Sequence, residues 1–525
     1  MSFRKYFKRS FLQKTLTILC GFLFIHALQS VSAQNRTGDN GDGTYTNPVI
    51  AADFPDLDVI RVKDCYYMVS TTMFVFPGVT ILKSHDLVNW SYCSNAVPRF
   101  DFAKQYNLLD GNRYGHGQWA TSLKYHNGKF YLLFITLDEG GFMCTADKAE
   151  GPWKITHLPK GFYDPGLFFD DNGKIYVAHG NSKIMMTEVD ENLRPIGPDS
   201  LVYTGDIRSG LEGTHVYKIN GYYYLYCTYG GLDGIQVALR SKNIYGPYEQ
   251  RVVIRDTTKG VTFGIHQGAL IQTTTGQWWT MLFVDSGPFG RFPSLQPVKW
   301  VDTWPVAGEN GHGVITYKKP DVGKNYNVEV LPTNDEFKAP ILGMQWGWNH
   351  NPDSTKWSLS EKSGVLRLHT VRVVDNLTEA VNTLTQRPFA KRNHLLPTIA
   401  TTKVDISHMQ PGDIAGLAVF QDPYAYIGIK REANKDLVIM VNNGKIIDSV
   451  QINQGVVYLK TLASNATKKA SFAFSLDGDK YKPLGNDLEM AFNLKIFTGN
   501  KFCLFNYPTR KLGGYVDFDW FHTNY

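Results

Sequence analysis

The chain has 525 residues, of which 14% are aromatic and 19% charged, and 48 are glycines. Its formal net charge is +6, but residues 1–33 supply five unopposed basic side chains, so the remainder carries only +1. This near-neutral remainder gives no indication of a nucleic-acid partner or of binding to a membrane surface. The length is sufficient for two domains with separate cores, and the aromatic and glycine content is typical of an all-β protein.

Residues 1–33 have the organisation of a secretory signal peptide. A basic start is followed by the apolar stretch Leu16–Leu28, which is too short to span a membrane, and by the small-x-small pattern Val31-Ser32-Ala33. We therefore expect export to the periplasm or secretion, without a membrane span. A lipid anchor on Cys20 is the weaker alternative, because this cysteine lies inside the apolar stretch.

Five cysteines follow the leader, and none has the spacing of a C-x-x-C pair or of a metal site. The odd number leaves at least one free thiol. Cys65, Cys144 and Cys227 lie in aromatic-rich strand sequence, which favours buried structural thiols, and no disulfide can be assigned. The polar, Gly- and Asn-rich residues 34–46 predict a flexible N-terminal segment.

A repeated hairpin motif begins at five places: Asp56, Trp119, Asp164, Glu212 and His266. Each copy has an entering strand, a tight turn that is usually Asn-Gly or Asp-Asn-Gly, and a returning strand rich in aromatic residues, as in WATSLKYHNGKFYLLF. Spacings of 45 to 63 residues without helical periodicity are typical of propeller blades. The repeats predict a five-bladed β-propeller over residues 47–325.

The first residue of each copy is expected to occupy the same place on the innermost strand of its blade. Asp56, Trp119, Asp164, Glu212 and His266 would then face one central funnel. These positions could simply begin strands. Three carboxylates near one axis are costly to bury, however, and this favours a functional reason for their presence.

Residues 341–525 show short alternating strands without the blade motif, which predicts a C-terminal β-sandwich. This sandwich could bind carbohydrate or support the propeller. The linker, residues 326–340, lacks the Gly/Ser or Pro richness of a free spacer, so we expect the sandwich to belong to the folding unit.

Several motifs, in order, resemble those of glycoside hydrolase family 43, which comprises inverting arabinofuranosidases, xylosidases and arabinanases. They are NPVIAADFPDLDVIRVKDCYYMVSTTM, FPGVTILKSHDLVNW, GFYDPGLFFDDNGKIYV, LEGTHVYKINGYYYL and GRFPSLQPVKW. The resemblance implies that Asp56 is the general base, that Glu212 is the general acid, and that Asp164 orients the acid and tunes its pKa. Inverting hydrolysis needs such a base and acid on opposite faces of the sugar, separated by space for a water molecule.

The resemblance also implies four substrate-binding residues, namely Met73, Trp119, His266 and Arg291. Met73 stands where xylosidases often have Phe, and Lys501 falls near the usual aromatic residue of a sandwich loop that reaches the pocket rim. No metal or other cofactor is expected to be required, although in some members a calcium ion lies beside the histidine that corresponds to His266.

We therefore expect an exo-acting inverting hydrolase that releases terminal α-L-arabinofuranosyl residues from hemicellulose side chains or oligosaccharides. The adaptable thioether of Met73 favours this sugar over a flat xylopyranose. The alternatives are a mainly β-xylosidase activity and a non-catalytic sugar-binding propeller. Retaining fructosidases share the five-bladed fold, but their Arg-Asp-Pro and Glu-Cys motifs do not occur in this sequence. The oligomeric state stays open.

Overall fold

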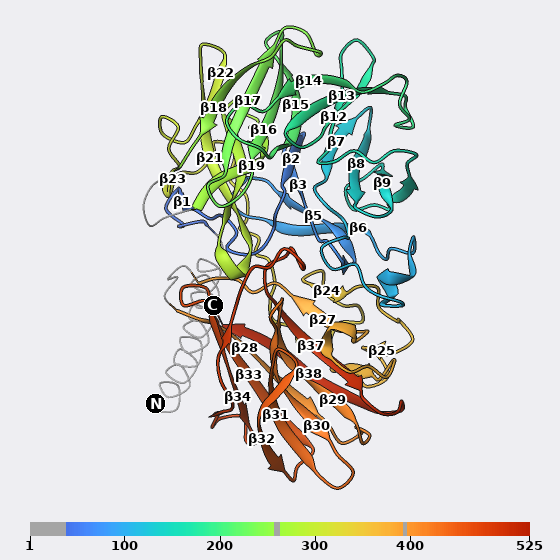
Figure 1. Cartoon of the computed structure of the whole chain (residues 1–525). Coiled ribbons are helices and arrows are strands. Elements are labelled where there is room, and N and C mark those ends of the chain that lie inside the picture. The colour runs from blue at the N-terminus through green and yellow to red at the C-terminus, as the bar shows by residue number, and fades with distance from the viewer. Residues whose placement is uncertain (1–37, 257–262, 392–395, 525) are drawn as a thin grey trace, which may run out of the picture.

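The computed structural model describes residues 38–256, 263–391 and 396–524. Two β-domains follow one another, a propeller in the upper half of Figure 1 and a sandwich in the lower half. The three short 3-10 helices of the described residues are η1 (Lys104–Asn107), η2 (Gly287–Phe289) and η3 (Leu377–Glu379). The signal peptide predicted for residues 1–33 lies outside the described residues. In the described part of the chain, no helix has the length and apolar character needed to cross a bilayer.

The five predicted blades are present, each as four antiparallel strands, and the prediction of a propeller followed by a sandwich is confirmed. Blades 4 and 5 are joined into one sheet by a single bridge between Ile235 and Ile265. The first three blades comprise β2 (Asp58–Val62), β3 (Cys65–Ser70), β5 (Gly78–Ser84) and β6 (Ser91–Val97); β7 (Ser122–His126), β8 (Lys129–Thr136), β9 (Gly140–Ala146) and β10 (Lys154–His157); and β11 (Gly166–Phe169), β12 (Ile175–His179), β13 (Lys183–Val189) and β14 (Ser200–Thr204). The last two comprise β15 (Leu211–Ile219), β16 (Tyr222–Tyr229), β17 (Ile235–Ser241) and β18 (Glu249–Ile254); and β19 (Phe263–Gln272), β20 (Trp278–Asp285), β21 (Arg291–Val301) and β22 (Trp304–Ala307).

The hairpin turns explain why the repeat is legible in the sequence. Asn127-Gly128 and Asn220-Gly221 each form a two-residue turn in which both residues have positive φ, of 49° and 81° and of 50° and 77°. Asn and Gly tolerate this conformation, and its twist matches that of the flanking strands.

The first described residues, which belong to the segment 34–46 predicted to be flexible, pack against the far end of the propeller sequence. Here β1 (Thr44–Thr46) pairs with β23 (Thr316–Lys318), which follows the last blade. Tyr45 is fully buried, and its hydroxyl donates to the Leu295 carbonyl at 2.8 Å. Pairing of distant chain segments, which composition does not reveal, orders this stretch.

The sandwich consists of two large antiparallel sheets. One runs β32 (Lys445–Ile452), β31 (Asp436–Asn442), β30 (Ala425–Arg431), β29 (Asp413–Phe420), β37 (Lys501–Pro508), β27 (Leu384–Gln386), β24 (Trp346–Asn349) and β4 (Val75–Phe76). The other runs β25 (Trp357–Ser358), β26 (Leu366–His369), β38 (Tyr515–Asn524), β28 (Thr398–Asp405), β33 (Val456–Ser464), β34 (Lys469–Ser475) and β35 (Lys482–Pro483), with β36 (Leu488–Glu489) also on β34.

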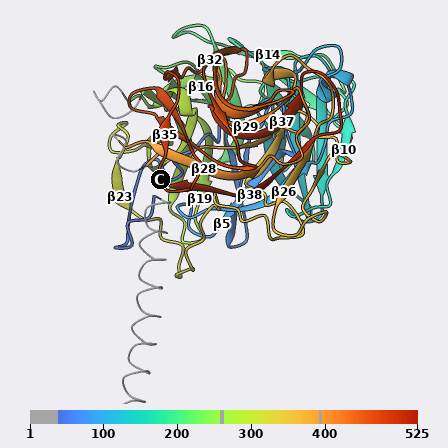
Figure 2. The same cartoon turned by 90° about the horizontal axis from the view of Figure 1, so that it is seen from below.

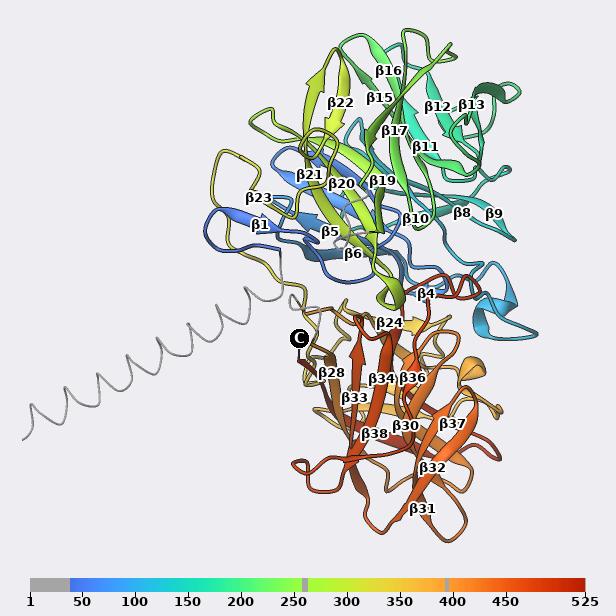
Figure 3. The same ribbon diagram turned by 60° about the vertical axis from the view of Figure 1, so that its left-hand side comes forward.

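The two domains share a sheet. Strand β4 leaves the first blade of the propeller and pairs with β24 of the sandwich, Trp348 opposite Phe76. Seen from the sandwich side, strands such as β28, β29 and β37 overlie the propeller (Figure 2). A red segment before β37 reaches the propeller beside β4 (Figure 3). This segment bears on the functional site.

Candidate active site

The three predicted catalytic carboxylates lie at irregular ends of inner strands. Asp56 and Asp164 have positive φ, of 54° and 46°, just before β2 and β11. Glu212 lies on β15, where the pairing shifts between Glu212 and His215 around Gly213, whose φ is 63°. Positive φ is strained for residues other than glycine, although aspartate tolerates it better than most. These irregular ends interrupt the regular alternation of the strands and allow the three carboxylates to approach one another.

Asp56 is bound to Arg291. The Arg291 Nη1 donates to Asp56 Oδ1 at 2.6 Å, and less than a tenth of either side chain is exposed. Arg291 begins β21 of the fifth blade, whereas Asp56 precedes the first strand of the first blade. This contact therefore joins the two ends of the repeat.

Glu212 receives two hydrogen bonds on one oxygen. The Tyr163 hydroxyl donates to Oε2 at 3.2 Å, and Asn181 Nδ2 donates to the same atom at 2.5 Å. Tyr163 directly precedes Asp164, so one short segment contributes to both groups. Gly230 lies against the other oxygen, since a Cβ at this position would be 2.9 Å from Glu212 Oε1.

The three carboxylates influence one another. Burial, followed by the charges of Glu212 and Asp56, raises the pKa of Asp164 well above its usual value. Burial also raises the pKa of Glu212, with a contribution from Asp56, although hydrogen bonds from Tyr163 and Asn181 oppose the rise. Asp164 and Glu212 therefore retain a proton as a pair to higher pH than isolated carboxyl groups would, which is the property that a general acid needs.

A substitution of Asp164 tests this coupling. The acid must be protonated, so activity is lost as pH rises through the pKa of the pair. In Asp164→Asn the pair cannot share a proton, so the site binds that proton less tightly and the alkaline limb of the pH profile of kcat/KM is expected to move to lower pH. The exposed Asp147→Asn serves as control. An alkaline limb that stays in place or moves to higher pH would contradict the coupling.

Arg291 has donors left for a ligand. Its Nε and Nη2 are buried, and neither has a hydrogen-bond partner among the residues that the structure describes. Three aromatic rings surround the guanidinium, namely Phe283 at 5.3 Å, Phe492 at 5.8 Å and Phe497 at 5.0 Å. Phe492 and Phe497 belong to the sandwich segment before β37. Buried donors without partners are costly, so their presence points to a bound polar molecule.

Trp119 and Met73 occupy different layers of one wall. Trp119 is partly exposed, and its ring lies 4.9 Å from Phe497 and 6.1 Å from Tyr163. Met73 is fully buried in a cluster with Phe74 and Ile496, against which Trp119 and Phe497 pack. Met73 therefore supports the aromatic wall from behind, and its role in substrate binding stays a prediction.

His266 is held by contacts within the fourth and fifth blades. Its Nδ1 lies 3.1 Å from Thr228 Oγ1 and its Nε2 lies 3.2 Å from Asp285 Oδ2, while its ring contacts Phe283 edge-on at 4.5 Å. Both ring nitrogens are thus engaged within the protein, and the described residues contain no group of three or more His, Cys, Asp or Glu side chains arranged to hold a metal. The calcium ion beside His266 stays a prediction from the resemblance.

The contacts above link the seven predicted site residues to one another, directly or through Phe283 and Phe497, and several partners join them that the sequence did not indicate. Tyr163 and Asn181 could have been found beside the Asp164 motif, because they flank it at the ends of its hairpin. Phe492 and Phe497 carry no local motif. The aromatic contribution of the sandwich comes from Phe497, whereas Lys501, where it was expected, is buried in an ion pair with Asp53.

Comparisons with known proteins agree with this geometry. Residues 45–305 match the model of glycosyl hydrolases family 43, and residues 334–524 match that of the beta xylosidase C-terminal concanavalin A-like domain. The two matches cover the propeller and the sandwich respectively.

Three relatives illustrate the range of names. A beta-xylosidase of Formosa agariphila is 34% identical over 93% of this chain and 91% of its own. The non-reducing end alpha-L-arabinofuranosidase BoGH43B of Bacteroides ovatus is 29% identical over 78% of each chain. The solved structure of a bifunctional GH43-CE protein of Bacteroides eggerthii is 39% identical with a TM-score of 0.84, covering 91% of this chain and 63% of that longer one. From the two family models that match it and from these relatives, the chain belongs to glycoside hydrolase family 43.

Proposed function

We propose that this glycosidase is an exo-acting, inverting β-D-xylosidase with α-L-arabinofuranosidase as its second activity. The observation that carries the proposal is the group of three carboxylates, in which Asp56 is held by Arg291 while Asp164 and Glu212 retain a proton. Asp56 would remove a proton from the attacking water. Glu212 would protonate the leaving oxygen, so the anomeric carbon would be inverted in one displacement.

The sugar preference differs from the sequence-based expectation. That expectation of mainly arabinofuranoside hydrolysis depended on Met73 as a loose pocket wall, but Met73 has no exposed surface. The partly exposed layer consists of the flat rings of Trp119 and Phe497, which suit the face of a pyranose. The name of the Formosa agariphila relative supports the same choice.

Arabinofuranoside hydrolysis is kept as the second activity because the Bacteroides ovatus relative carries that name. Export by residues 1–33, to the periplasm or outside the cell, and oligosaccharides or polysaccharides as substrates belong to the same proposal. No cofactor has a part in it.

The test compares kcat/KM on 4-nitrophenyl β-D-xylopyranoside and 4-nitrophenyl α-L-arabinofuranoside. We expect the xyloside to be preferred, xylo-oligosaccharides to yield xylose alone, and proton NMR to show the α-anomer first. A preference for the arabinofuranoside would make arabinofuranosidase the main activity and β-xylosidase the second. Oligosaccharide products without monosaccharide would contradict exo action. From a β-xyloside, β-xylose as the first product would contradict inversion.

A further inference from the structure

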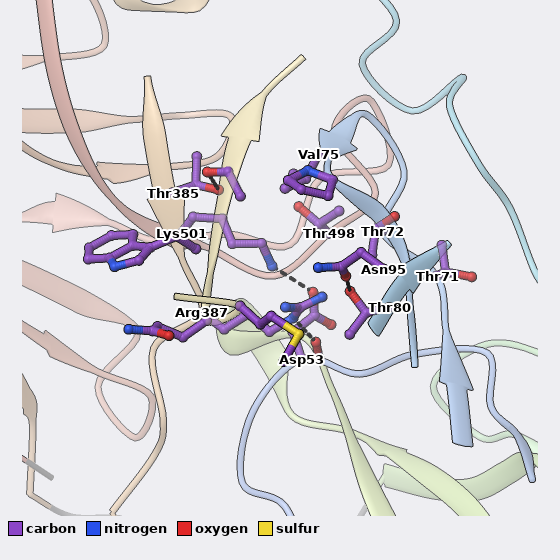
Figure 4. Close-up of a pocket in the computed structure, with 15 residues that line it drawn as sticks. Asp53, Thr71, Thr72, Val75, Thr80, Asn95, Thr385, Arg387, Thr498 and Lys501 are labelled. Carbon is purple, nitrogen blue, oxygen red and sulfur yellow. Dashed lines mark hydrogen bonds and ion pairs between the residues drawn. The ribbon is translucent and has the colours of Figure 1, made fainter. Parts of the chain in front are cut away.

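A buried ion pair crosses the interface between the domains. Lys501, the first residue of β37 in the sandwich, places its Nζ 3.0 Å from Asp53 Oδ2, and the two side chains are 6% and 2% exposed. Figure 4 shows the Lys501 side chain pointing at Asp53 in a pocket lined by residues of both domains. Asp53 precedes the catalytic Asp56 by three residues.

Asp53 is fully engaged by both domains. Three residues of the sandwich donate to it. The Gly499 main-chain N–H donates to Oδ2 at 2.8 Å, Lys501 Nζ donates to the same atom at 3.0 Å, and Arg387 Nε donates to the main-chain oxygen of Asp53 at 2.7 Å. From the propeller it accepts the main-chain N–H of Arg291 on Oδ1 at 3.0 Å. The carboxylate thus connects the sandwich to the backbone of the arginine that binds Asp56.

The turn that leads into Arg291 is held on both sides. A Cβ at Gly290 would lie 2.2 Å from Asp53 Oδ1, so the turn rests against the carboxylate. On the sandwich side, Asn500 donates its main-chain N–H and its Nδ2 to the Pro288 carbonyl at 2.8 Å and 2.7 Å. Within the described part of the chain, the only side-chain hydrogen bond of Arg291 is the one that Nη1 donates to Asp56.

We propose that Asp53 and Lys501 are positioning residues, which orient the general base Asp56 through Arg291 and so make the sandwich a contributor to catalysis. The proposal rests on the glycosidase activity above. Burying an ion pair costs desolvation of both charges, and such pairs are often no more stabilising than apolar side chains of the same volume. Stability is therefore a poor explanation for this pair, whereas orientation is a good one, because a displacement of about 1 Å can cost about 100-fold in rate.

The test replaces Lys501 with methionine, which keeps most of the side-chain volume and removes the charge. We expect kcat on the preferred aryl pentoside to fall about 10- to 100-fold. Because Lys501 is proposed to act through Arg291, Lys501→Met should cost less than twofold once Arg291 is already methionine. A purely structural role would cost the same factor in both backgrounds, and this result would overturn the proposal.

The control is Arg372→Met. Arg372 of the sandwich also crosses the interface, where it donates to the Leu108 carbonyl of the propeller at 2.7 Å, and neither residue is close to Arg291 in the sequence. This substitution should leave kcat unchanged. If Lys501→Met does not fold, the neutral pair Asp53→Asn with Lys501→Met replaces it. We expect the same loss, since Arg291 and Gly499 donate to different oxygens of Asp53 and an asparagine has an acceptor at only one of these two positions.

A second readout is independent of activity. Hydrogen exchange at residues 286–291 should be faster in Lys501→Met than in the wild type and in Arg372→Met. Unchanged exchange would overturn the positioning role even if the enzyme is active. A wild type that hydrolyses neither aryl pentoside would instead contradict the proposed function, and faster exchange would still support the connection between Lys501 and Arg291.

Discussion

Replacement of Asp56 by alanine is expected to abolish hydrolysis of both xylo-oligosaccharides and activated aryl glycosides, with a loss in kcat/KM of roughly 10²–10⁴-fold. The reason is the position of Asp56 beside Arg291, where its carboxylate is buried and oriented by a charged hydrogen bond at 2.6 Å. We identify no other described carboxylate with this contact. Without Asp56 the attacking water keeps its proton, and the quality of the leaving group cannot compensate.

The measurement is kcat/KM on both substrate classes, with circular dichroism to show that the variant is folded. The control is the exposed Asp147→Asn, which should behave as the wild type. An Asp56→Ala enzyme that kept aryl glycoside hydrolysis within tenfold of the wild type would assign the base to another residue.

Replacement of Glu212 by alanine is expected to reduce activity on xylo-oligosaccharides much more than activity on aryl glycosides. Hydrolysis of xylo-oligosaccharides should fall by roughly 10²–10⁴-fold, because the departing sugar hydroxyl needs a proton. Activity on 4-nitrophenyl glycosides should stay measurable, because an aryloxide leaves without one. The raised pKa of Glu212 and its contacts with Tyr163 and Asn181 are the structural basis for this role.

A series of aryl glycosides with leaving groups of increasing pKa gives the quantitative test. The slope of log kcat against leaving-group pKa should be steeper in Glu212→Ala than in the wild type, and the alkaline limb of the pH profile should disappear. If Asp56→Ala and Glu212→Ala lose activity equally on both substrate classes, the two roles are misassigned.

The part of the fold that could be predicted is the part encoded locally. Turns such as Asn127-Gly128 need positive φ at two successive residues, and few residue types allow it. The repeat of these turns predicted the blades, and the alignment of the blades predicted that Asp56, Asp164 and Glu212 would meet. A propeller converts equivalent sequence positions into neighbouring positions around one axis, so this inference needed no knowledge of side-chain contacts.

Contacts between distant segments could not be predicted in the same way. The polar composition of residues 38–46 does not reveal β23, with which β1 pairs. The sequence position of Met73 likewise does not show that Trp119 and Phe497 pack against the cluster in which it is buried.

The sequence alone predicted the two domains and the five blades, because turn chemistry and the repeat period are local properties, and its motifs supplied the candidates for acid and base. Only the tertiary structure decided what surrounds those residues. The pairing of β4 with β24 and the Asp53–Lys501 contact bring the sandwich to Arg291, and Phe497 reaches Trp119 across a sequence separation of hundreds of residues. These contacts depend on how two separately patterned sheets pack together, and no local pattern in the chain records that packing.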